Sequence, residues 1–70
     1  MTLKKLLEAL KFEGHISLRR DNFGGMQYIG GGNSEHISSR YGGYKVDKSS
    51  IIDNILIVYV KPESVKLVVL

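Results

Sequence analysis

The chain has 70 residues, with ten Lys and Arg against seven Asp and Glu, for a formal net charge of +3, and no cysteine. A chain this short forms one domain, residues 1–70, with a thin core, because it buries only about 60% of the surface that its unfolded form exposes. The lack of cysteine excludes a disulfide framework and a thiolate metal site. No apolar run approaches the roughly 20 residues of a membrane span. We therefore expect a cytoplasmic protein without a membrane partner that gains stability as a homodimer.

The first predicted element is an amphipathic helix from Thr2 to Lys11. Thr2 can cap it, and Gly14 predicts its stop. Its apolar residues recur at i, i+3, i+4 and i+7, which places them on one side of the helix: Leu3, Leu6, Leu7 and Leu10. We expect this leucine stripe to pack on a sheet.

Two strands should follow the helix. His15–Arg19 alternates between polar and apolar residues, as in a half-buried strand. Asp21-Asn22 turns the chain, and Gly25–Ile29 can return antiparallel to the first strand. The glycines at 24 and 25 weaken the start of this second strand, which a bulge or an edge position would explain.

The middle of the chain is the least regular part. Gly30 to Asn33 predicts a flexible connection, after which Ser34 can cap a short helical turn that extends to Arg40. Tyr41-Gly42-Gly43-Tyr44 then breaks the turn. A third strand is expected from Lys45 or Val46 to Ile52.

The run Ile55–Val60 is the stretch around which the chain is organised. Its six β-branched, aliphatic or aromatic residues predict a central strand that is buried on both faces. Asp53-Asn54 joins it to the preceding strand at hairpin spacing. After the turn at Pro62, Val65–Leu70 predicts a last, apolar strand that can pair with another subunit.

These elements predict an α+β fold, with the N-terminal helix packed on an antiparallel sheet of four or five strands and a short helical turn between strands two and three. A small open barrel of the same strands is the alternative. The expected core comprises Leu6, Leu7, Leu10, Ile16, Leu18, Ile55, Ile57 and Tyr59, or the in-between residues Leu56 and Val58.

The sequence offers little for catalysis, so we expect neither an enzyme nor a cofactor. Glu35 and His36 are adjacent and point in different directions on a helix, and His15 has no evident partner. The two histidines also lack metal-ligand spacing. The glycine run before Ser34 follows a strand and precedes a helix, as in phosphate-binding loops, but it lacks both glycine motifs of nucleotide-binding proteins.

Binding is the expected activity, and the long connection from Gly30 to Tyr44 is the expected place for it. Tyrosine and arginine often dominate binding energy. The predicted binding residues are Arg40, Tyr41 and Tyr44, helped by Arg19 or Lys45. The other interpretation is that the two tyrosines of this segment only cover the end of the sheet.

A basic and aromatic surface is the alternative, and it predicts a small nucleic-acid-binding protein. Cations that pair phosphates alternate along the chain with rings that stack on bases. The residues are Arg19, Arg20, Arg40, Lys45 and Lys48, with Tyr28, Tyr41 and Tyr44. No helix-turn-helix, zinc finger or RNP-type pattern accompanies them.

In its layout the chain resembles very short proteins of phages and mobile elements of Gram-positive bacteria. The similarity lies in the opening Met-Thr-Leu-Lys-Lys-Leu-Leu-Glu-Ala-Leu, the strand Ile16 to Arg19, the stretch Tyr41 to Val46 and the ending Ile55 to Lys61. Some proteins of this size inhibit host defence, among them anti-CRISPR proteins and sequesterers of cyclic-nucleotide signals. The resemblance therefore implies a non-enzymatic binding protein, acting in the host cell on a host protein or a phosphate-bearing ligand.

Overall fold

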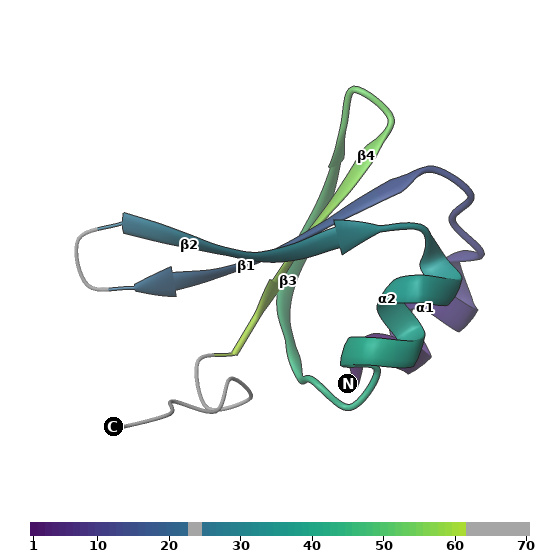
Figure 1. Cartoon of the computed structure of the whole chain (residues 1–70), viewed down its shortest axis with the longest axis horizontal. Coiled ribbons are helices and arrows are strands. Elements are labelled where there is room, and N and C mark those ends of the chain that lie inside the picture. Colours follow the sequence, from purple (N-terminus) through teal and green to yellow (C-terminus); the bar gives the residue numbers. More distant parts are fainter. Residues whose placement is uncertain (23–24, 62–70) are drawn as a thin grey trace.

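The computed structural model describes residues 1–22 and 25–61. Within them the chain forms two helices and a four-stranded sheet, which confirms the predicted α+β class. Both helices lie on one side of the strongly twisted sheet (Figure 1). In chain order the elements are α1 (Leu3–Leu10), β1 (His15–Asn22), β2 (Gly25–Gly32), α2 (Ser34–Tyr41), β3 (Val46–Ile52) and β4 (Ile55–Val60).

The sheet has the strand order β2-β1-β4-β3 and is mixed, so the prediction of a wholly antiparallel sheet is wrong. β1 and β2 form one antiparallel hairpin, and β3 and β4 form another. The two hairpins meet where β1 pairs with β4 in parallel. A parallel pair requires a long crossover, which α2 and β3 provide here. The described sheet is open, with edges at β2 and β3, and the predicted strand Val65–Leu70 lies outside the described residues.

Helix α1 agrees with the predicted range. The Thr2 hydroxyl accepts a hydrogen bond from the backbone N–H of Lys5 at 3.4 Å. Lys11 ends the helix in the left-handed conformation, with φ of 49°. Gly14 is therefore not the stop; a Cβ there would lie 2.8 Å from the backbone oxygen of Asn54, so this glycine permits a close approach of two chain segments.

Strand β4 is central, as predicted, but it is not buried on both faces. Its burial alternates, and Leu56, Val58 and Val60 face the helices. Of the two alternatives for the core residues of this strand, the in-between residues Leu56 and Val58 are therefore confirmed, and Ile55, Ile57 and Tyr59 are half-buried on the opposite face. In α1, Leu10 is 45% exposed and lies outside the core, and Leu6 is only partly buried against it. The observed core comprises Leu3, Leu7, Ile16, Leu18, Ile37, Leu56, Val58 and Val60.

The β3–β4 hairpin turns through Asp53 and Asn54, as predicted. Both residues have positive φ, 52° and 62°, which the two-residue type I′ turn requires. Asp and Asn tolerate this conformation better than most residues.

The glycine run belongs to β2 and is not a flexible connection. Gly30, Gly31 and Gly32 pair with β1 residues. Each glycine leaves space that a neighbouring side chain occupies: a Cβ at Gly30 would lie 2.7 Å from the Tyr41 hydroxyl, and one at Gly32 would lie 2.9 Å from the His36 ring. Gly30 and Gly32 therefore leave room for side chains of the following helix, α2, to pack against β2.

Helix α2 is a full helix of eight residues and not a short turn. Its cap is Asn33, one residue before the predicted Ser34. The Asn33 side-chain Oδ1 accepts a hydrogen bond from the backbone N–H of His36 at 2.8 Å. The buried Ile37 anchors α2 on the sheet.

Candidate functional site

The face of the sheet away from the helices carries a row of side chains contributed by all four strands. We call it the cross-strand row: Tyr28 of β2, Arg19 of β1, Tyr59 of β4 and Lys48 of β3. Arg19 is in register with both tyrosines, and Lys48 is in register with Tyr59. Because neighbouring strands lie about 4.8 Å apart, the row spans about 14 Å and alternates a ring with a cation.

One contact within the row holds a cation close to a ring. The Lys48 Nζ lies 4.8 Å from the centroid of the Tyr59 ring and 3.5 Å from Oδ2 of Asp21. Lys48 and Asp21 are both well exposed, so this ion pair contributes little to stability and can yield to another anion. The lysine is therefore positioned over the sheet without being locked there.

Arg19 lies over the floor of the open face. Its Nε donates a hydrogen bond to the Ser17 hydroxyl at 3.1 Å. Ser17 is only 5% exposed although no helix covers it, which follows from the arginine side chain above it. The Arg19 side chain is thus directed along β1 toward Ser17, while its Cα lies in register between those of Tyr28 and Tyr59.

Gly31 allows Tyr28 to lie along the sheet. The Tyr28 hydroxyl occupies the position that a Cβ at Gly31 would take, and Nε2 of His15 lies 3.0 Å from the same position. A phenol hydroxyl and an imidazole nitrogen therefore both lie over Gly31, beside the row. Tyr28 itself is 57% exposed, so its ring is available to a ligand.

The predicted binding residues divide between two sides of the sheet. Arg40, Tyr41 and Tyr44 are together on the helical side: the two rings contact edge to face at 5.4 Å, and the Arg40 guanidinium carbon lies 5.9 Å from the Tyr41 centroid. Both tyrosines pack against the core. Arg19, by contrast, lies on the open face.

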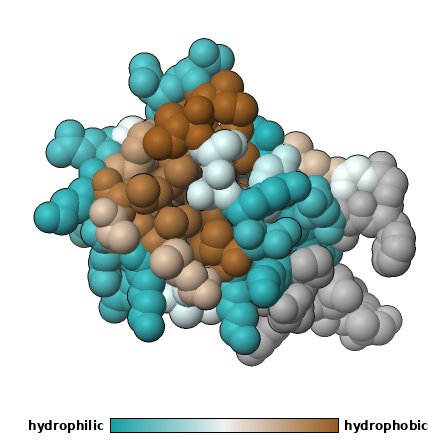
Figure 2. All heavy atoms as spheres, turned by 180° about the vertical axis from the view of Figure 1, so that it is seen from behind, coloured by the Kyte–Doolittle hydropathy of each residue, from teal (hydrophilic) through white to brown (hydrophobic). Residues whose placement is uncertain are grey.

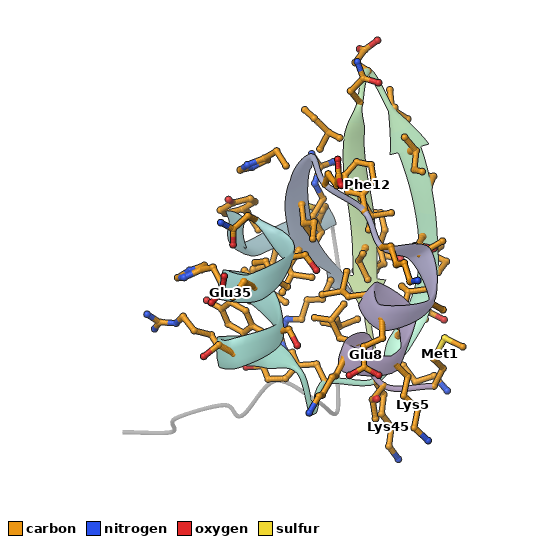
Figure 3. The ribbon with its side chains drawn as sticks, turned by 90° about the vertical axis from the view of Figure 1, so that its right-hand side faces the viewer. Met1, Lys5, Glu8, Phe12, Glu35 and Lys45 are labelled. Atoms are coloured by element: carbon orange, nitrogen blue, oxygen red, sulfur yellow. The ribbon has the colours of Figure 1, made fainter. Side chains whose placement is uncertain are left out.

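Tyr44 and Lys45 form part of the junction between the N-terminus and β3. The backbone oxygen of Tyr44 accepts a hydrogen bond from Leu3 at 2.7 Å, and Lys45 bridges to Thr2. Figure 3 shows Lys45 beside Lys5 at the α1 side of the molecule, away from Glu35 on α2. The structure therefore favours the interpretation that Tyr41 and Tyr44 cover the end of the sheet.

The candidate catalytic residues do not assemble. His15 is on the open face and His36 is on α2, on the other side of the sheet. Among residues 1–22 and 25–61, no three His, Asp or Glu side chains gather as metal ligands would. In that same part of the chain, no helix has the length and apolar character needed to cross a bilayer.

A second surface is apolar. Seen from behind, the molecule has a broad hydrophobic area bordered by hydrophilic side chains (Figure 2). The large exposed apolar residues of α1 and β3 are Leu10, Ile51 on the helix side of the sheet and Ile52 on the open face. β3 is an edge of the described sheet, and exposed edges are where strands of other chains pair.

Of the cross-strand row, the sequence predicted Tyr28, Arg19 and Lys48 as members of a basic and aromatic surface but left open whether Tyr59 or its neighbours belong to the core. Alternation along β4 is the signal that separates Tyr59 from its buried neighbours Val58 and Val60.

Comparison with protein-family models, with curated proteins and with solved structures finds no match to this chain.

Proposed function

We propose that the protein is a non-enzymatic binding protein that holds a phosphate-bearing ligand on the open face of its sheet. The observation that carries the proposal is the cross-strand row, in which Arg19 lies in register between Tyr28 and Tyr59 and Lys48 lies over the Tyr59 ring. Guanidinium and ammonium groups pair with phosphate, and exposed rings supply flat contact area at low entropic cost.

Several features of the row support an anionic ligand. The Asp21 carboxylate lies next to the row, is exposed, and has an ion pair with Lys48 in which Oδ2 and Nζ are 3.5 Å apart. A phosphate of the ligand can take its place beside the lysine. His15 adds a nitrogen beside the Tyr28 hydroxyl. The chain as a whole carries a formal charge of +3, which favours the approach of anions.

Titration with adenosine monophosphate, followed through the backbone amide resonances, tests the proposal. We expect shifts that concentrate on Ser17 to Arg19, Tyr28 and Tyr59. Arg19→Gln should weaken the affinity that the titration gives by at least fivefold, because a hydrogen bond to a charged group is lost. Lys5→Gln is the matched control, since it removes the same charge from α1 (Figure 3), and it should bind as the unmodified chain does.

Shifts confined to Arg40, Tyr41 and Tyr44 would place the site on the helical side, as the sequence predicts. The absence of any shift at millimolar nucleotide would contradict the proposal outright. A thermal melt of Arg19→Gln guards against unfolding as the cause of lost binding.

The resemblance to phage proteins adds two parts to the proposal. The first is that capture of the ligand inhibits a host defence, for which binding without turnover is sufficient. The second is homodimer formation through the β3 edge, where Ile51 is exposed. Sedimentation at micromolar concentration tests the second part: Ile51→Lys should shift a dimer toward the monomer, and a chain that is monomeric throughout would contradict it.

A further inference from the structure

We infer that the ligand of the open face is a single-stranded nucleic acid, whose bases stack on Tyr28 and Tyr59 while its phosphates pair with Arg19 and Lys48. The inference rests on the proposed function and specifies the ligand of the same site. Four observations carry it: the spacing of the two rings, the openness of the face, the position of the cations and the small residues beside the row.

The spacing of the rings suits more than one base. Tyr28 and Tyr59 are in register with the same residue, Arg19, from the strands on either side of it. They are therefore two strand spacings, about 10 Å, apart. A single base covers one ring, so a ligand that uses both rings has at least two bases.

Within residues 1–22 and 25–61, the face is a platform and not an enclosed pocket. Both helices lie on the other side of the sheet, and the row crosses it from one edge strand to the other. Pockets for small ligands are concave and bury most of the ligand. An open sheet with exposed aromatic residues is the arrangement on which unpaired bases stack in sheet-based and barrel-based single-strand binders.

The cations alternate with the rings and do not form a separate patch. In register, Arg19 lies between Tyr28 and Tyr59, and the Lys48 Nζ reaches back over the Tyr59 ring, 4.8 Å from its centroid, to Asp21 of β1. A strand that crosses the sheet along the row thus meets each ring with a cation beside it. For a base to stack on Tyr59, Lys48 leaves Asp21 and the ring and pairs with a phosphate of the ligand instead.

Small residues beside the row are covered by the row's own side chains, which therefore lie along the sheet. Gly31 and Ser17 lie one pair along from Tyr28 and Arg19 on the same face. The Tyr28 hydroxyl occupies the space over Gly31, and the Arg19 Nε donates a hydrogen bond to the Ser17 hydroxyl. Tyr28 is 57% exposed in this position, so a base can stack on it from the solvent side.

In a duplex each base is stacked between its neighbouring base pairs, which conceals the flat faces that the tyrosine rings would contact, so a duplex should bind poorly. The test uses fluorescently labelled dT15 and rU15, and a 15-base-pair DNA duplex, with anisotropy as the readout. We expect both single strands to bind at least tenfold more tightly than the duplex. Comparison of dT15 with rU15 shows whether the protein prefers DNA or RNA, since both ligands offer bases and phosphates.

Tyr28→Leu should weaken single-strand binding by between about fivefold and 150-fold, the range measured for loss of one stacked base. Tyr28→Phe keeps the ring and should bind nearly as the unmodified chain does. Because Tyr28 is largely exposed, both variants are expected to fold, which thermal melts check.

Salt provides an independent measure of the phosphate contacts. Neutralising about two phosphates gives a slope of about −1.4 in log affinity against log salt for a single strand. Affinity should then fall about sevenfold between 50 and 200 mM salt. Lys48→Ala should halve that slope.

Three outcomes would overturn the inference: a duplex bound as tightly as dT15, Tyr28→Leu bound as tightly as Tyr28→Phe, or no binding of either single strand. If adenosine monophosphate shifts the open-face amides while the single strands do not bind, the proposed function stands and only the single-strand inference fails. If neither binds, both fail.

Discussion

The two faces of the sheet are built from the same strands and differ in almost every physical property. On the covered face, Ile16, Leu18 and Val58 pack beneath the helices and are fully buried. On the open face, one residue along each strand, Arg19 and Tyr59 lie among polar and half-exposed neighbours. Alternation lets a thin domain use one set of residues for its core and the other for contact.

Two consecutive arginines make the contrast plain. Arg20 points to the covered face, is only 7% exposed, and its Nε donates a hydrogen bond to Oε1 of Gln27 at 2.6 Å. Arg19 points to the open face, where its Nε is directed to Ser17. The difference teaches that charge alone does not identify a binding residue; the face on which the charge lies must be known as well.

The largest expected effect concerns the covered face. Leu7→Ala removes a side chain that is 3% exposed in the core and should lower the free energy of unfolding by about 2–5 kcal/mol. Domains of this kind are stable by only about 5–15 kcal/mol, so the melting temperature should fall steeply. The same change at Leu10, on the exposed side of α1, should have a small effect. If the melting curve of Leu7→Ala coincided with that of the unmodified chain, the packing of α1 on the sheet would be contradicted.

The same substitution, Gly to Ala, at two adjacent glycines tests the two faces of the sheet separately. Gly30→Ala places a Cβ 2.7 Å from the Tyr41 hydroxyl on the covered side, where the ring is held by the core, and should destabilise by about 1–3 kcal/mol. Gly31→Ala instead displaces the exposed Tyr28 ring. It should weaken dT15 binding while lowering the melting temperature less than Gly30→Ala does.

Equal losses of stability in the two alanine variants, with binding unchanged in both, would show that Tyr28 is not oriented by Gly31. Chemical denaturation and anisotropy on the same samples measure the two quantities separately.

The arginine pair gives the next effect in size. Arg20→Gln loses a hydrogen bond from a charged group and should lower the free energy of unfolding by about 1.5 kcal/mol, with single-strand binding unchanged. Arg19→Gln should do the opposite: it should change stability by about 1 kcal/mol or less and reduce binding. Denaturation curves measure the stability of both variants, and anisotropy measures their binding. If only Arg20→Gln lost binding, the ligand would bind on the face that Arg20 occupies and not on the open face.

Much of the fold could be predicted from sequence because its signals are local. The leucine spacing of α1, the Asp53-Asn54 turn and the β-branched run of β4 each specify an element within about ten residues. The glycine run misled because glycine usually marks a flexible connection. The side chains that fill its space come from other positions in the fold, such as Tyr41, eleven residues after Gly30.

The candidate site was harder to predict because it depends on strand order. Arg19 and Tyr59 are forty residues apart and meet only because β1 pairs with β4 in parallel. A wholly antiparallel sheet would place other neighbours beside Arg19. Six apolar residues in a row also conceal the alternation of β4, so the sequence did not decide which alternate residues face the core, and Tyr59 on the open face could not be told from its buried neighbours.

The smallest expected effect concerns the ion pair at the end of the row. Asp21 and Lys48 are both exposed, and their oxygen and nitrogen lie 3.5 Å apart, so their attraction is worth about 0.2–1 kcal/mol. Asp21→Asn removes this competitor for Lys48 and also a negative charge that repels phosphate. Binding of dT15 should therefore tighten by up to about fivefold at low salt, and the gain should shrink as salt screens the charges. Anisotropy at 20 and 200 mM salt measures both, with Glu8→Gln on α1 (Figure 3) as the control for the change in net charge. If Glu8→Gln tightens binding as much as Asp21→Asn, the effect belongs to the net charge of the molecule, and Lys48 makes no specific contact with the ligand.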